Sequence, residues 1–256
     1  MMGFGLIEIL ISAQKIFAVS FDIEGLVSSI NYSYKVMNLP ISIFLFSVLS
    51  VLFPTMTKIK DQKELDKIAI NLLSAIFFVM LPFTVILFNY AEFIISILFE
   101  RGEFGKQSVS ITASQLKSFS LLLIPLSFFA AQLRIVFVQR KWSKIYYSGL
   151  MIITFSIVLN LIAIQYSSLI LFSYSLPIAY ISSIVIVFKK SLLLSINPDL
   201  IKTVIAVLTS IIVTMLINTF LQINQLIIIE ICIMIGVYFI MQYLIKNTLL
   251  MKILRR

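Results

Sequence analysis

The sequence predicts an all-α fold, a polytopic membrane bundle of about eight transmembrane helices. Two observations carry this prediction. Of the 256 residues, 61% are hydrophobic and 12% are charged, whereas a soluble domain is about half apolar and about a quarter charged. The apolar residues also gather in runs of about 20, the length that crosses a hydrocarbon core roughly 30 Å thick. Lipid is therefore expected to surround most of the chain.

The first predicted helix, residues 4–20, is the weakest of the set. It carries Glu8 and Lys15 within its apolar run, and these charges argue against a cleaved signal peptide, whose centre is apolar. The two residues are two helical turns apart and so share one face. In lipid this face must point toward protein or water. The helix is therefore either buried in the bundle or polar along a pathway.

The second predicted helix, Gly25 to Met56, is the stretch around which the chain is organised. Its sequence, GLVSSINYSYKVMNLPISIFLFSVLSVLFPTM, contains one basic residue, Lys35, and has Pro40 inside the apolar run. A proline in a helix interior removes a backbone donor and crowds the preceding turn, so we expect a kink. The stretch is either an ordinary membrane span or a helix that lines a cavity, with Lys35 facing an anionic group.

The remaining helices follow from apolar length and flanking charge. The charged segment 58–67 is expected to be a loop or a helix start. The segment 91–104 is too short and too charged at its end to span, so we expect an interfacial or re-entrant piece. Broken helices are common in transporters, although they also occur in ordinary bundles. The other predicted spans are 68–90, 108–138, 145–165, 169–188, 201–221 and 226–245, and the prolines inside spans are Pro40, Pro82, Pro125 and Pro177.

The basic residues predict the orientation of the bundle. With the N-terminus in the cytoplasm and the spans alternating, fifteen Lys and Arg residues fall inside and four fall outside, with Lys15 within the first helix. Lys and Arg favour the cytoplasmic side, so both termini are expected there, with the basic tail 246–256 lying on the anionic leaflet. The fifteen are Lys58, Lys60, Lys63, Lys67, Arg134, Arg140, Lys141, Lys144, Lys189, Lys190, Lys202, Lys246, Lys252, Arg255 and Arg256, and the four are Lys35, Arg101, Lys106 and Lys117.

The composition excludes several kinds of chemistry. The chain has no His and one Cys, so imidazole acid–base chemistry, an internal disulfide and a Cys/His zinc pattern are absent. The sequence holds neither a glycine-rich phosphate loop nor a cluster of carboxylates. We therefore expect no enzyme, no metal and no cofactor. The net charge is +9, and the charged residues lie mostly between the apolar runs. This distribution is typical of the loops of a membrane protein rather than of a nucleic-acid-binding surface.

Three stretches carry a resemblance to a known family. NYSYKVMNLPISIFLFSVLSVLFPTMTK, Asn31 to Lys58, resembles a signature with a basic residue, Leu-Pro and an apolar run that ends in Pro. ILFERGEF, Ile97 to Phe104, is similar to a Phe-Glu-Arg-Gly-x-Phe motif and is the most specific match. RIVFVQRKW, Arg134 to Trp142, matches an aromatic-rich helix end. The family is the MurJ/MviN lipid II flippase family, within the multidrug/oligosaccharidyl-lipid/polysaccharide exporter superfamily.

The resemblance implies two six-helix lobes that face each other across a central cavity, often with two added C-terminal helices. The chain resembles the second lobe, residues 1–190, followed by the two added helices and a basic tail, residues 191–256. One lobe alone does not enclose a cavity. The chain is therefore expected to be part of a longer product, to pair with a separately encoded first half, or to form a parallel homodimer.

The resemblance also implies the site. Lys35 matches a cavity arginine of the family, and Asn38 matches a position that is often acidic. The motif after residue 99 is expected either to brace the outer end of the cavity or to form only a salt-bridged turn. The candidates for substrate binding are Lys35, Asn38, Lys117 and Arg134. The side chain of each basic candidate could instead extend to the membrane interface. The structural candidates are Glu100, Arg101, Gly102, Phe104, Pro40 and Pro82.

The implied function is translocation of an undecaprenyl-pyrophosphate-linked cell-wall precursor, such as lipid II, across the bacterial inner membrane by alternating access. The expected partners are this lipid-linked oligosaccharide, membrane lipids and the first lobe, with no nucleic acid. Three alternatives stay open: a flippase half for another lipid-linked oligosaccharide, as in polysaccharide export; a truncated remnant that transports nothing; and a membrane-embedded enzyme, for which no carboxylate pair is visible.

Overall fold

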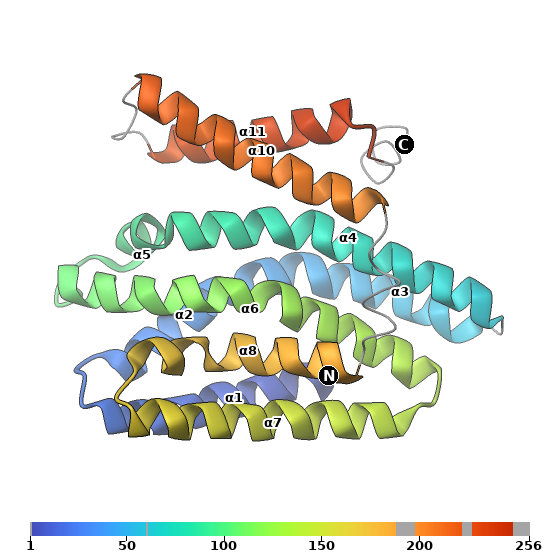
Figure 1. The fold of residues 1–256 in the computed structure, drawn as a ribbon, viewed down its shortest axis with the longest axis horizontal. Helices are drawn as coiled ribbons and strands as arrows, with labels where there is room; N and C mark the ends of the chain where they lie inside the picture. The colour runs from blue at the N-terminus through green and yellow to red at the C-terminus, as the bar shows by residue number, and fades with distance from the viewer. Residues whose placement is uncertain (1, 60, 188–197, 222–226, 248–256) are drawn as a thin grey trace.

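The computed structural model describes residues 2–59, 61–187, 198–221 and 227–247. Within these residues the elements are helical throughout, as the sequence predicts (Figure 1). Two short pieces, the 3-10 turn η1 (Val19–Phe21) and the π-helix η2 (Ile41–Leu45), join longer helices. The α-helices are α1 (Met2–Ala18), α2 (Leu26–Pro40), α3 (Phe46–Lys58), α4 (Gln62–Asn89), α5 (Ala91–Phe99), α6 (Lys106–Val138), α7 (Trp142–Gln165), α8 (Leu169–Val187), α10 (Pro198–Leu221) and α11 (Ile227–Leu244).

Seven stretches of the described chain are long and apolar enough to cross a membrane. They correspond to the second to eighth predicted spans. α1 has 17 residues and rises about 26 Å at 1.5 Å per residue, slightly less than a hydrocarbon core of roughly 30 Å. The chain is a multi-pass membrane protein whose first helix is the marginal one. The seven are Leu26–Ser50, Lys63–Asn89, Lys106–Val138, Trp142–Gln165, Leu169–Ile186, Pro198–Ile217 and Ile227–Leu244.

The long helices run roughly along one direction, so their ends gather at two ends of the molecule (Figure 1). The connections α1–α2, α4–α5–α6 and α7–α8 lie at one end, and α3–α4 and α6–α7 lie at the other. α1 begins and α11 ends at the α3–α4 end. The start of α1 and the end of α11 therefore lie toward the same end of the molecule. The predicted tail 246–256 lies almost wholly outside the described residues.

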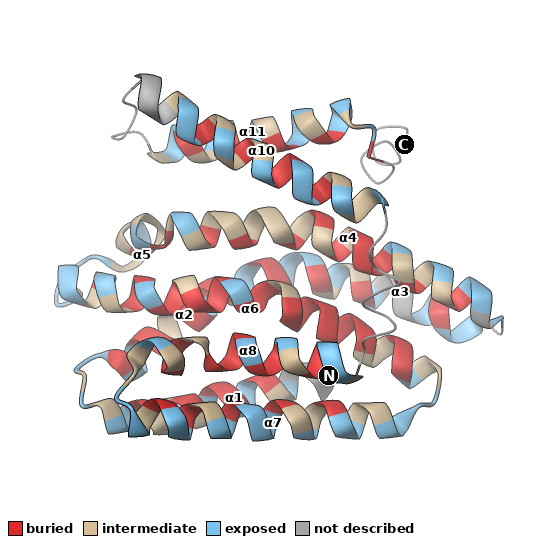
Figure 2. Ribbon diagram, in the orientation of Figure 1, coloured by how far each residue is buried: buried red, intermediate tan, exposed pale blue. Residues whose placement is uncertain are grey.

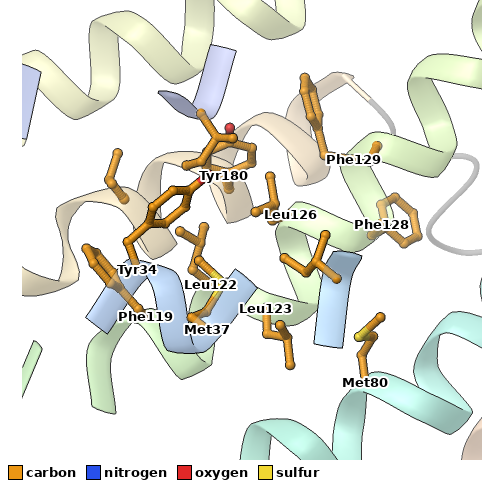
Figure 3. Close-up of a cluster of buried hydrophobic side chains, with 14 of the residues drawn as sticks. Tyr34, Met37, Met80, Phe119, Leu122, Leu123, Leu126, Phe128, Phe129 and Tyr180 are labelled. Carbon is orange, nitrogen blue, oxygen red and sulfur yellow. The ribbon is translucent and has the colours of Figure 1, made fainter. Parts of the chain in front are cut away.

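α6 is the central helix of the bundle. It packs against α2, α4, α5 and α8, and most of its length is buried (Figure 2). In the core, Phe119 of α6 lies in one cluster with Tyr34 of α2, Met80 of α4 and Tyr180 of α8 (Figure 3). Because lipid tails are as apolar as these side chains, close packing and polar contacts between helices hold such a bundle together.

The α10–α11 hairpin forms a second layer on α4. Phe78 of α4 is buried in a small cluster with Ala206 and Val207 of α10 and Tyr238 of α11. Among the described helices, the pair packs chiefly against α4 (Figure 1). The hairpin is thus attached along one side of the bundle.

The structure selects the helix start, one of the two alternatives expected for the segment 58–67. Most of it is helical, because α3 continues to Lys58 and α4 begins at Gln62, six residues before the predicted start. Asp61 caps α4, and its side chain accepts a hydrogen bond from the Lys63 N–H at 3.1 Å. An aspartate at this position satisfies a backbone donor that the helix leaves free. The charges therefore form helix ends rather than a loop.

Candidate functional site

One side of the helical stretch α2–η2–α3 is polar and uncovered. Its residues recur every three or four positions on α2, which is the spacing of one helix face. Each is exposed or half-buried, and a polar side within a span must meet protein or water rather than lipid. We call this set the α2 stripe: Ser28, Asn31, Lys35, Asn38, Ser42, Ser47, Ser50 and Thr57.

The π-helix keeps both halves of the α2 stripe on one side. Pro40, where we expected a kink, is directly followed by η2, in which the Phe46 N–H bonds to the carbonyl oxygen of Ile41. Ser42 inside this element and Ser47 just after it are five residues apart rather than three or four. A π-turn takes more residues than an α-turn, so the five-residue step returns to the same face. Such insertions are frequent at functional sites.

Ser28, Lys35 and Asn38 are the members of the α2 stripe whose side chains make no hydrogen bond or ion pair within the described residues. Several hydroxyls of the stripe bond to carbonyl oxygens of their own helix. Lys35 is exposed and makes no hydrogen bond or ion pair with its side chain in the described part of the chain. One turn on, the half-buried Asn38 has a buried Oδ1 that accepts no hydrogen bond. A lysine at membrane depth costs about 2.5–3.5 kcal/mol on insertion scales, so Lys35 needs water or an anion.

α1 supplies a second polar edge beside α2. Glu8, Ser12 and Lys15 recur along one side of α1, and Glu8 and Ser12 are exposed. The Tyr34 hydroxyl donates a hydrogen bond to Oε1 of Glu8 at 2.8 Å. This contact places Glu8 beside the helix turn that carries Lys35. We call the α2 stripe together with Glu8, Ser12 and Lys15 the polar face.

The polar face offers a binding surface rather than a reaction centre. Its functional groups are ammonium, amide, hydroxyl and one carboxylate, a set that binds anionic and sugar groups. In the described residues, His, Cys, Asp and Glu form no group of three or more that could hold a metal ion. The arrangement therefore suits reversible binding of a polar, anionic molecule within the membrane.

A family model described as the lipid II flippase MurJ matches residues 1–240. The chain belongs to the MurJ family. Curated relatives, each described as a probable lipid II flippase MurJ, are similar to it. The protein of Borreliella burgdorferi is 25% identical over 172 residues, which is 66% of this chain and 34% of the relative. That of Rickettsia prowazekii is 30% identical over 146 residues, which is 56% of this chain and 28% of the relative.

A solved structure shares the fold of this MurJ-family chain. The lipid II flippase MurJ in an inward closed conformation matches with a TM-score of 0.74 and 21% identity. The match covers 94% of this chain and 51% of that one. The MurJ-family fold is therefore shown for nearly the whole chain, and the chain spans about half the length of that structure.

Lys117 and Arg134 lie apart from the polar face of the MurJ-family chain. Thr112 of α6 accepts a hydrogen bond from α2, and Lys117 lies about 140° around the α6 axis from it at 100° per residue. Lys117 instead continues a separate row on α6, with Gln107, Ser110 and Ser114. Arg134 lies about 26 Å further along α6 and is half-buried. The structure thus brings Lys35 and Asn38 together but not Lys117 or Arg134.

The MurJ-family motif that follows α5 forms a turn packed on α2. Gly102 has φ = 58°, a left-handed conformation that glycine adopts most readily. The ring centroids of Phe99 and Phe104 lie 4.8 and 5.4 Å from that of Tyr32, one turn before Lys35. The structure corrects one prediction here, because Glu100 and Arg101 are both exposed and do not pair with each other. Aromatic packing rather than a salt bridge holds the turn against α2.

Sequence reasoning missed most of the α2 stripe and the partner of Glu8. The serines and asparagines at 28, 31, 38 and 42 have the spacing of one helix face, and this signal could have revealed the stripe. The Glu8–Tyr34 contact joins residues 26 positions apart on different helices. Nothing in the local sequence marks such a pair.

Proposed function

We propose that the polypeptide containing this chain is a flippase for an undecaprenyl-pyrophosphate-linked cell-wall precursor such as lipid II. The chain supplies one lobe, the second, and its polar face lines half of a central cavity. The substrate's pyrophosphate binds to Lys35 and to neighbouring amides and hydroxyls, while its lipid tail stays in the bilayer. Rocking of the lobes then opens the cavity to each side in turn. No covalent step is needed.

The observation that carries this proposal is the exposed Lys35 in the middle of a membrane-spanning stretch. Its ammonium group has no partner in the described residues. A covering lobe, water and an anionic substrate would offset the free-energy cost of placing this charge within the membrane. Membership of the MurJ family supports lipid II as that substrate. Relatives described as probable lipid II flippases agree with this choice.

The proposal extends to location and orientation. We place the protein in the bacterial inner membrane with both ends of this chain in the cytoplasm. Support comes from the excess of Lys and Arg in the connections on that side. Residues 1–190 then form the six-helix lobe, and residues 191–256 form the two added helices and the tail. The first lobe, on the same or a separate polypeptide, covers the polar face.

Flipping of fluorescent lipid II by the full-length gene product in proteoliposomes tests the proposal. Lys35→Ala should slow flipping about tenfold or more, the factor for losing a charge-assisted hydrogen bond. Lys35→Arg keeps the charge and should retain most activity. Lys63→Ala, at the exposed start of α4, is the control. Unchanged flipping by Lys35→Ala, or none by the wild type, would contradict the proposal.

A further inference from the structure

Three consecutive residues of α2 point in three directions. Ser33 Oγ donates to the carbonyl oxygen of Thr112 on α6 at 2.7 Å. The Tyr34 hydroxyl donates to Glu8 on α1 at 2.8 Å. Lys35 is exposed. Successive helix residues are about 100° apart, so Lys35 lies about 200° around α2 from Ser33, on the side turned away from α6.

We infer that Glu8 is a positioning residue for Lys35. By accepting the hydrogen bond of Tyr34, it fixes the rotation of α2 that keeps Lys35 on the uncovered side of the lobe. The Ser33 contact holds one side of α2 and the Tyr34 contact holds the next side. The two contacts lie at adjacent residues, so together they oppose rotation of the helix about its axis.

The setting of Glu8 supports this role. Among the described acidic residues, Glu8 lies farthest inside a helix, as the seventh residue of α1, while the others lie in connections or within the first five residues of a helix. No Lys or Arg nitrogen in the described part of the chain lies within 4.0 Å of the Glu8 carboxylate. The partner of Glu8 is therefore Tyr34, and neutralising a nearby Lys or Arg does not explain why Glu8 is present in this helix.

Tyr34 links this contact to the packed interior. Its side chain is 8% exposed and lies in the core cluster with Met37 and Tyr180 (Figure 3). A hydroxyl at this depth is costly without a partner, and Glu8 supplies one. Apolar contacts alone give little preference for one rotation of a membrane helix, because lipid solvates the same side chains equally well. The polar contacts supply the missing preference.

Thiol labelling at position 35 tests the inference in the full-length protein in membranes. Lys35→Cys is made together with Cys232→Ser, and its rate of reaction with N-ethylmaleimide, a neutral reagent, is measured. To this background one adds Glu8→Ala, Glu8→Gln or Tyr34→Phe. Glu8→Gln keeps an acceptor oxygen but loses the charge, so its comparison with Glu8→Ala isolates the hydrogen bond. Tyr147→Phe, an exposed tyrosine on α7, is the matched control.

Glu8→Ala and Tyr34→Phe should each change the labelling rate about fivefold, the factor for one hydrogen bond. Glu8→Gln and Tyr147→Phe should leave it within about twofold. The inference is overturned if the labelling rates of Glu8→Ala and Glu8→Gln are equal, or if the labelling rates of Tyr34→Phe and Tyr147→Phe are equal. A variant that fails to fold is recognised by loss of the protein from the membrane. If either Glu8→Ala or Tyr34→Phe fails in this way, the labelling rate of the other decides the test.

The consequence for transport rests on the proposed function. With Lys35 native, Glu8→Ala and Tyr34→Phe should raise the lipid II concentration for half-maximal flipping about fivefold, and Glu8→Gln should not. The labelling assay needs no substrate. If the wild type does not flip lipid II, the proposed function is contradicted, but the inference that Glu8 positions Lys35 is not. If the labelling rate is unchanged in the variants, only the inference about Glu8 is contradicted.

Discussion

The Tyr238 hydroxyl lies 2.7 Å from the carbonyl oxygen of Phe78 and donates a hydrogen bond to it. In a regular helix this carbonyl would accept from the N–H four residues on, but that residue is Pro82, which has none. α11 thus satisfies the acceptor that the proline in α4 leaves free. An unpaired carbonyl in hydrocarbon costs several kcal/mol, so the contact explains both the tolerance of Pro82 and the docking of the hairpin.

Tyr238→Phe should lower the thermal stability of the protein in detergent, because the Phe78 carbonyl is then unpaired. The expected loss is about 1–2 kcal/mol. Pro82→Ala restores an N–H to α4, so Tyr238→Phe should cost less than about half as much in that background. The loss of helical circular dichroism on heating in detergent measures these changes.

Tyr243→Phe is the control for this pair of variants, because Tyr243 is exposed on the same helix. It should change stability by less than about 0.5 kcal/mol. Equal costs of Tyr238→Phe with and without Pro82 would show that the freed carbonyl is not what Tyr238 satisfies.

Gly102→Ala should destabilise the turn after α5 by about 1 kcal/mol, because an alanine is strained in the left-handed region. Gly105→Ala is matched to it. Neither added methyl meets another atom within 4 Å, and Gly105 has an ordinary φ of −83°. Melting temperatures of the two variants therefore compare backbone strain alone. Two equal melting temperatures would be evidence against a strained turn.

The stability of the α4–α5 corner should depend on pH through Tyr90. Burial, and then the charge and hydrogen bond of Glu230, raise the pKa of Tyr90 from 10.0 to about 12. The neutral phenol is thus favoured in the folded state. Its contribution is present below about pH 10 and is lost as the pH rises through about 12. Wild-type melting temperature should fall more steeply across this window than that of Tyr90→Phe.

The comparison with Tyr90→Phe matters because other tyrosines ionise in the same pH range. Glu230→Gln should give an intermediate slope, since it removes the charge but leaves the burial. Identical slopes for wild type and Tyr90→Phe would exclude Tyr90 as the source.

Deletion of Ile43 should be tolerated. The π-helix holds one residue more than an α-turn, and Ile43 is an exposed member of it. Removing it should convert η2 to an α-turn and keep Ser50 on the polar face. A cysteine at position 50, with Cys232 replaced, should then react with a water-soluble thiol reagent at about the wild-type rate. Deletion of the buried Leu123 from the regular helix α6 should abolish folding.

The spans could be predicted from the sequence because each must cross lipid with its own backbone hydrogen bonds satisfied. The α-helix was therefore the structure expected for each long apolar run. The start of α4 was placed too late, since the cap Asp61 and the charges after it resembled a loop. Pro40 marked an irregularity, but whether it would produce a kink or a π-turn depended on the register of the two halves.

The helices that pack against each helix could not be predicted from the sequence. Ser33 meets Thr112 across 79 positions, and Tyr34 meets Glu8 across 26. Such contacts depend on packing and have no local pattern. The charge of Lys117 was visible, for example, but its direction on α6 was not. Lys35 and Asn38 could be paired in advance because one turn of a helix separates them.

Protection of the polar face by lipid II tests the central claim most directly. In the full-length protein with Cys232→Ser, Asn31→Cys places a thiol on the α2 stripe one turn from Lys35, and its reaction with a water-soluble thiol reagent is followed. Lipid II should slow labelling about tenfold, and Lys35→Ala should abolish this protection, because the charge that holds the pyrophosphate is lost. An absence of protection, or equal protection without Lys35, would contradict the account.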